Sequence, residues 1–154
     1  MTAAAEDRLQ QRREVKRASI LAEAWALAHR DGLAAISLRD LADAVGLRQP
    51  SLYVYFASKR DMYDAMFADG YRQLLEVIGR RRHAREPRAA LTAFVKDCVQ
   101  FSSDDVVRHQ LLFQRTIPGF EPSPASGGPR SGEWRDTFKY VPRTLIIRAR
   151  KEGI

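Results

Sequence analysis

The sequence of 154 residues lacks the features of several protein classes. A single cysteine, Cys98, excludes an internal disulfide. It lies in an apolar helical pattern, which predicts a buried and unreactive thiol. No apolar run approaches the roughly 18 residues of a membrane span, and the polar N-terminus has no apolar core for a signal peptide. We therefore expect a cytoplasmic protein.

Catalytic and cofactor-binding motifs are also missing. The three histidines, His29, His83 and His109, are far apart in the sequence, and none stands near cysteines or carboxylates at the spacing of metal ligands. The chain has no glycine-rich phosphate loop and no G-x-S-x-G motif. The sequence therefore predicts no enzymatic activity, no metal site and no cofactor.

Positive charge is in excess. The chain has 26 Lys and Arg against 19 Asp and Glu, a net charge of +7, which favours a polyanionic partner. Residues 1–12 are predicted to form a flexible arm, and this arm and the next turn are locally basic through Arg8, Arg12, Arg13, Lys16 and Arg17. Such an arm either contacts DNA phosphates or a minor groove, or is only a solvated tail.

Residues 37–59 read as two short helices joined by a tight turn and followed by a third helix. Ser37 is predicted to cap the first helix, with the Asp40 carboxylate reaching back to the backbone amide of the cap. Gly46 supplies the left-handed residue of the turn, and Pro50 suits the first turn of the next helix. This is the helix-turn-helix pattern. A plain helical hairpin within an all-α core has the same spacing.

The residue types in this stretch are more specific evidence than the helical spacing alone. The string S-L-Y-x-Y-F-x-S-K follows an A-x-x-V-G-L turn. This string resembles the signature of the TetR (tetracycline-repressor or AcrR-like) family of bacterial transcription regulators. The resemblance covers residues 13–73 and continues more weakly to 124. It is carried by Ile20-Leu21-Ala22-Glu23-Ala24, Gly32, Ser37-Leu38-Arg39-Asp40-Leu41-Ala42, Val45-Gly46-Leu47, Ser51-Leu52-Tyr53-Val54-Tyr55-Phe56 and Ser58-Lys59.

The resemblance implies an all-α fold, in which an N-terminal helix-turn-helix head is joined to a helical-bundle body. We expect a DNA-binding domain at 13–73, a partial regulatory domain at 74–124 and an atypical tail at 125–154. Apolar periodicity places helices at about 15–31, 59–82 and 87–102. Ser103 or Asp104 is expected to cap a further helix that ends at Pro118-Gly119.

The resemblance also implies a function, namely a ligand-responsive repressor that binds a palindromic operator as a homodimer. The residues expected to contact DNA, by match to the family motif, are Arg39, Arg48, Gln49, Pro50, Ser51, Tyr53, Tyr55 and Lys59. An unknown small-molecule effector would bind in the body. The aromatic residues that could line its pocket are Phe67, Tyr71, Phe94, Phe101 and Phe113, although an aromatic stripe at helical spacing is also typical of plain core.

The last part of the chain departs from the family pattern. TetR-like proteins usually finish with two long amphipathic helices that pack against the partner subunit, and residues 125–154 carry no such pair. Either the chain is a natural short variant, or the reading frame shifts near Ala125. The alternative functions are a small-molecule-binding helical module and a truncated remnant with impaired dimerisation and DNA binding.

Overall fold

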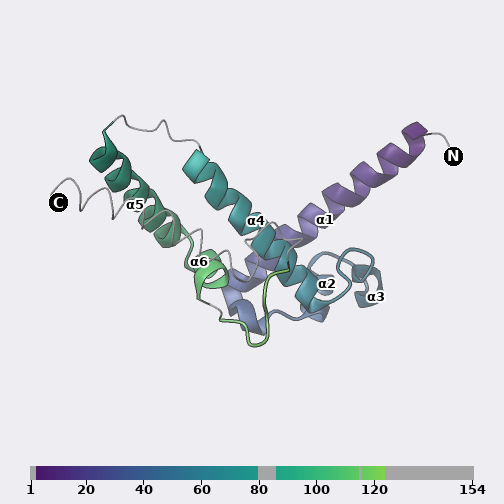
Figure 1. Ribbon diagram of the computed structural model, residues 1–154. Coiled ribbons are helices and arrows are strands. Elements are labelled where there is room, and N and C mark those ends of the chain that lie inside the picture. Colours follow the sequence, from purple (N-terminus) through teal and green to yellow (C-terminus); the bar gives the residue numbers. More distant parts are fainter. Residues whose placement is uncertain (1–2, 80–85, 115, 124–154) are drawn as a thin grey trace. The chain divides into compact units, whose positions relative to one another are not determined.

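The structure is a computed structural model that describes residues 3–79, 86–114 and 116–123 (Figure 1). Every regular element among these residues is a helix, which confirms the predicted all-α class. In chain order the helices are α1 (Ala3–Asp31), the 3-10 helix η1 (Leu33–Ala35), α2 (Leu38–Ala44), α3 (Gln49–Leu52), α4 (Lys59–Gly79), α5 (Pro87–Asp104) and α6 (Val106–Phe113).

The chain forms two compact units. Among the described residues, the first unit consists of 3–66 together with 116–120, and the second consists of 67–79, 86–114 and 121–123. The division falls within α4, between Met66 and Phe67. The helix-turn-helix pattern therefore lies wholly in the first unit.

The core of the first unit is built from one apolar stripe on each of its helices. In α1 the buried positions are Ile20, Ala24, Leu27 and Ala28, which recur at three and four residues. The largest side chains that are fully buried in this unit are Ile20, Leu41, Leu52, Phe56, Met62 and Met66. Each such side chain stabilises the fold by about 1.5–3 kcal/mol relative to an exposed position. α1 and α4 thus hold α2 and α3 in a fixed arrangement.

The N-terminal segment is helical, and the predicted flexible arm at residues 1–12 is wrong over its described part. α1 begins at Ala3 rather than near Val15. Its added turns are rich in Ala, Glu, Arg, Leu and Gln, which are the strongest helix formers. Gln10 Nε2 also donates to Glu14 Oε1 at 3.0 Å across one turn. Polarity suggested a solvated arm, but local propensity favours a helix.

The second unit contains α5 and α6, and its helix starts show one confirmed prediction and one wrong one. Pro87 opens α5 as predicted, with Glu86 as the cap that accepts from Arg88 N and Ala89 N. The predicted cap of the next helix, Ser103 or Asp104, is wrong, because both residues still belong to α5. Asp105 caps α6 instead, and its carboxylate accepts from Arg108 N at 2.9 Å. α6 ends at Phe113, before the predicted Pro118-Gly119.

α5 buries a narrower apolar stripe than predicted. Phe101 is buried and Phe94 is half-buried, whereas Val95 and Val99 are 49% and 59% exposed. Cys98 is half-buried, so the expectation of a buried thiol is wrong. The apolar spacing identified the helix correctly, but it did not show how much of its surface the rest of the unit covers.

Some predicted features lie outside the described residues. They are the basic run at 80–85, the predicted end of α4 near Arg82 and the whole tail at 125–154, including the proposed frame shift near Ala125. Within the part that the structure describes, no helix is both long and apolar enough to span a membrane.

Candidate nucleic-acid interface

The start of α2 is fixed by the predicted pair, Ser37 and Asp40. Ser37 Oγ accepts from Asp40 N at 3.0 Å, which satisfies one of the free N–H groups at the helix start. The Asp40 carboxylate in turn accepts from Ser37 Oγ at 2.6 Å, rather than from the backbone amide that a capping box uses. The prediction of Ser37 as the cap is confirmed.

Gly46 ends α2 and turns the chain toward α3. Its φ of 67° lies in the left-handed region. Gly46 N donates to Asp43 O at 3.2 Å and Leu47 N donates to Ala42 O at 2.9 Å, which together form a Schellman motif. The predicted glycine turn is confirmed, and its hydrogen bonds fix the direction in which α3 leaves the turn.

α3 is shorter than the predicted recognition helix. It ends at Leu52, so Tyr53 and Tyr55, which were expected within the helix, lie in the turn that follows. Tyr55 N and Phe56 N both donate to Leu52 O, at 2.9 and 3.0 Å, and the i−3 bond tightens this last turn. The backbone therefore keeps a helical turn past Leu52, and the two tyrosines directly follow α3.

Burial alternates along this segment and separates an inner from an outer face. Leu52 and Phe56 are buried, as predicted. Outward-facing side chains lie between and before them: those of Gln49, Pro50, Ser51 and Tyr53 are exposed, Tyr53 by 46%, while Tyr55 is half-buried. The outer face therefore combines an amide, a hydroxyl and a phenol ring, groups that can pair with base edges or phosphates.

Three basic residues of α1 contact the helix-turn-helix at its central turn and just after α3. Arg13 Nη2 donates to Val54 O at 2.8 Å, and Lys16 Nζ donates to Val45 O at 3.4 Å. The Arg17 guanidinium stacks over Phe56, 4.7 Å from the ring centroid. These positioning contacts were not predicted. The only sequence signal for them was the recurrence of basic residues at one helical turn.

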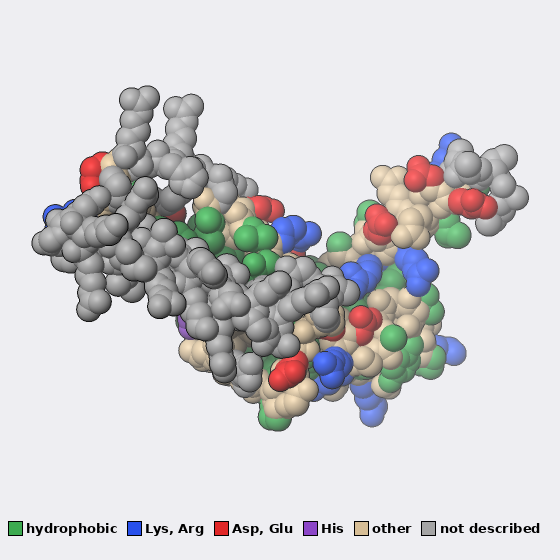
Figure 2. Space-filling view, in the orientation of Figure 1, with side chains coloured by type: hydrophobic (Ala, Val, Ile, Leu, Met, Phe, Trp, Pro, Cys, Tyr) green, Lys and Arg blue, Asp and Glu red, His purple; other side chains and the backbone are tan. Residues whose placement is uncertain are grey.

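The predicted cationic contacts divide into two groups. Arg39 and Arg48 are exposed, and neither side chain makes a hydrogen bond or ion pair with any residue in the described ranges. Lys59 is half-buried: its Nζ donates to Ala34 O at 3.3 Å and lies 5.5 Å from the centroid of the Tyr63 ring. Figure 2 shows Lys and Arg side chains spread over the surface that α1, α2 and α3 form, with acidic side chains among them.

The start of α4 positions Lys59 and closes the core beneath it. Ser58 Oγ accepts from Asp61 N at 3.1 Å, and the Asp61 carboxylate accepts from Ala57 N at 3.0 Å. One turn later, buried Tyr63 donates its hydroxyl to Leu33 O at 2.6 Å. Burial raises the pKa of the Tyr63 phenol above its usual 10.0. The neutral phenol is therefore the form that this site favours.

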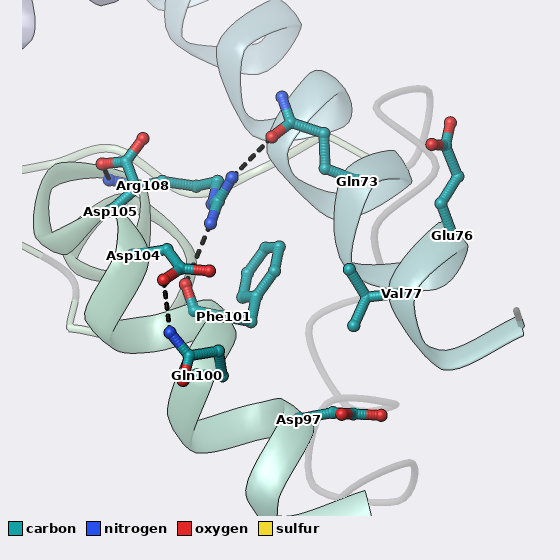
Figure 3. Close-up of a pocket in the computed structure, with 9 residues that line it drawn as sticks. All are labelled: Gln73, Glu76, Val77, Asp97, Gln100, Phe101, Asp104, Asp105 and Arg108. Carbon is teal, nitrogen blue, oxygen red and sulfur yellow. Dashed lines mark hydrogen bonds between the residues drawn. The ribbon is translucent and has the colours of Figure 1, made fainter. Parts of the chain in front are cut away.

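The second unit holds a cavity of about 420 Å³ (Figure 3). Its lining is mainly polar and comprises Gln73, Glu76, Val77, Asp97, Gln100, Phe101, Asp104, Asp105 and Arg108. Arg108 is held within it, because Nη1 donates to Gln73 Oε1 at 2.6 Å and Nη2 donates to Phe101 O at 2.9 Å. The guanidinium also stacks on Phe101, 3.8 Å from the ring centroid. Although four carboxylates line the cavity, no group of His, Cys, Asp or Glu among the described residues could hold a metal ion.

The five aromatic residues predicted to line a pocket do not gather at this cavity. Only Phe101 lines it. Phe67 is buried and stacks with Tyr71, with ring centroids 6.3 Å apart, and Phe113 pairs with His109 at 5.2 Å. Phe94 is half-buried on α5. The cavity instead receives charged and amide residues from α4, α5 and α6, which the sequence reading did not single out.

Comparison with known proteins gives a family and two similar structures. Residues 20–66 match the model of the bacterial regulatory proteins of the tetR family. The chain resembles the crystal structure of the regulatory protein SCO4313, with 25% identity and a TM-score of 0.63, over 77% of this chain and 57% of that one. It also resembles the TetR family transcriptional regulator PfmR from Thermus thermophilus, with 24% identity and a TM-score of 0.64, over 87% and 71% of the two chains.

The chain thus spans little more than half the length of SCO4313. No curated protein matches its sequence. The matched residues run from the first buried residue of α1 to Met66 in α4, and so contain the whole helix-turn-helix core described above. Residues 20–66 are therefore a domain of the tetR family of bacterial regulatory proteins.

Proposed function

We propose that the chain is a sequence-specific, DNA-binding transcription regulator in which α3 enters the major groove. The observation that supports this most is the outer face of α3 and its following turn. This exposed face carries an amide, a hydroxyl and a phenol beside the apolar Pro50 and Val54, and a buried core and three contacts from α1 hold it in place. A helix of this kind is narrow enough to reach base edges in the major groove of B-DNA.

The residues divide by the contact that each can make. Gln49 pairs best with adenine, whose N6 and N7 match its amide. Ser51 contacts a base or a phosphate, and the Tyr53 and Tyr55 hydroxyls reach phosphates. Arg39, Arg48 and Lys59 are the cationic phosphate contacts, and Pro50 fixes the start of α3. Lys59 must give up or share its bond to Ala34 O when it meets a phosphate.

The proposal includes a homodimer on a palindromic operator, because one short helix reads too few bases for repression. Two recognition helices would enter successive major grooves about 34–36 Å apart. Such a protein acts where the DNA is, in the bacterial cytoplasm. Its activity is binding rather than catalysis.

The cavity in the second unit is the proposed effector site. Its lining carries four carboxylates and one guanidinium, so we expect a polar effector rather than an apolar one. The effector would lower DNA affinity by binding more tightly to the conformation that does not fit the operator.

The proposal is tested by selecting DNA duplexes from a random library with the full chain. The expected result is a palindromic consensus whose half-sites are one helical turn apart. Gln49→Ala is expected to relax the preference at one base of each half-site, since it removes a base-edge contact worth about 1–3 kcal/mol. A selection that yields no consensus, with wild type and variant alike, would show that the chain does not read sequence.

A further inference from the structure

α1 carries a basic surface that the matched family domain does not include. Arg8, Arg12 and Lys16 are spaced by four residues and therefore lie on one face of the helix. We name these three residues the N-terminal basic stripe. They line one hollow on the helix surface together with Gln11, Val15 and Ser19. The structure therefore agrees with the sequence spacing, since both put the three residues on one face.

Basic and acidic side chains lie on different sides of this part of the helix. At about 100° per residue, the three acidic residues of the same turns, Glu6, Asp7 and Glu14, lie at least about 120° around the axis from Arg12. None of them lines the hollow that the stripe borders. The stripe is therefore a surface of one sign on a helix whose overall charge is mixed.

The stripe begins at the helix-turn-helix and runs outward from it. Lys16 donates to Val45 O, just before the glycine turn, and Arg13 donates to Val54 O, between Tyr53 and Tyr55. Arg12 is the next residue outward from Arg13, and Arg8 lies one further turn along. In Figure 1 this part of α1 projects past α2 and α3. The stripe therefore adjoins the residues of α1 that contact the helix-turn-helix, and it continues beyond them along the helix.

We propose that the N-terminal basic stripe binds DNA phosphates that flank the major groove occupied by α3. This inference rests on the proposed function. Arg8 and Arg12 are about 6 Å apart along the helix axis, so their long side chains can reach neighbouring phosphates of one strand. Both are exposed, and neither side chain bonds to any residue that the structure describes. Their guanidinium groups are thus available for phosphates.

The test measures how DNA affinity depends on salt for the full chain and for the double variant Arg8→Gln with Arg12→Gln. Glutamine keeps the helix propensity and removes the charge. On a duplex selected by the wild-type chain, the slope of log K against log salt is expected to become shallower by about 2 per chain, with base preference unchanged. Arg88→Gln with Lys96→Gln on α5 is the matched control, because it removes two exposed charges from the second unit.

The outcomes separate this inference from the function on which it rests. If the wild-type chain binds no duplex, both are wrong. If it binds with a salt-dependent affinity that the stripe variant and the control change equally, the inference is wrong and the proposed function stands. Hydroxyl-radical footprinting of the wild-type complex tests the stripe without any variant. Protection beyond the outer edges of the selected half-sites is expected, and protection confined to the half-sites would overturn the inference.

Discussion

At the scale of single residues, Tyr63 shows how one buried polar group joins two parts of the head. Its ring packs beside Phe120, with centroids 5.6 Å apart, and its hydroxyl donates to Leu33 O in η1. Leu33 itself is buried, so its carbonyl would lose a needed donor without Tyr63. The same α4 turn carries Lys59 on its outside. Tyr63 thus supports the position of a proposed phosphate contact.

We predict that Tyr63→Phe lowers the free energy of unfolding by about 1–2 kcal/mol near neutral pH, because a buried carbonyl loses its hydrogen bond. The phenol pKa is raised in the folded protein, so the folded state holds this proton more tightly than the unfolded chain does. The wild-type advantage is therefore complete below pH 10.0 and is lost as the pH rises through the folded pKa.

Urea unfolding of both proteins between about pH 9 and about pH 11 measures this advantage. The difference in unfolding free energy between wild type and variant should narrow with rising pH. A difference that stays constant over this range would contradict the assigned role of the hydroxyl.

At the scale of elements, the turn between α2 and α3 fixes the direction of α3, which carries the proposed DNA contacts. Gly46 is left-handed, with a φ of 67°. A Cβ built at this position meets nothing within 4 Å, so backbone strain alone opposes a side chain there. The cost of such strain is about 1–2 kcal/mol for most L-residues and less for asparagine.

We therefore predict that Gly46→Ala lowers the unfolding free energy by about 1 kcal/mol and that Gly46→Asn lowers it less. Equilibrium urea unfolding measures both, and the Asn variant serves as the control for the added side chain. Equal losses in the two variants would mean that something other than the left-handed backbone matters at this turn.

The elements also show which features local sequence can predict. Ser37, Gly46 and Pro50 each have a short-range preference that matches the observed structure, and these predictions are confirmed. The cap of α6 was missed because residues 102–105 are Ser-Ser-Asp-Asp, and all four residues are of types that favour a cap. Longer-range contacts distinguish them: Arg108, whose N–H the cap accepts, is held by Gln73 and Phe101.

The candidate site was predictable only in part for a similar reason. The outward position of Gln49, Ser51 and Tyr53 follows from the burial of Leu52 and Phe56, which apolar spacing indicates. The contacts of Arg13 and Lys16 with the helix-turn-helix join residues 41 and 29 positions apart, and no local pattern encodes them. The polar cavity likewise draws its lining from three helices, and of the aromatic residues predicted to line a pocket only Phe101 borders it.

At the scale of the whole molecule, the excess of positive charge and the family domain point to the same partner. The net charge is +7, and the proposed contacts with DNA lie in the first unit together with the N-terminal basic stripe. Each phosphate contact releases condensed counterions. The slope of log K against log salt therefore measures the number of phosphate contacts. The described part of the second unit contributes the proposed effector site.

The measurement that tests the central claim most directly is the fluorescence anisotropy of a labelled, selected duplex titrated with the full chain at several salt concentrations. Log K is expected to fall linearly with log salt, with a slope of about −0.9 for each phosphate contacted, and a scrambled duplex of the same length should bind more weakly at every salt concentration. Binding that is independent of salt, or equal for both duplexes, would contradict the claim that this head reads DNA.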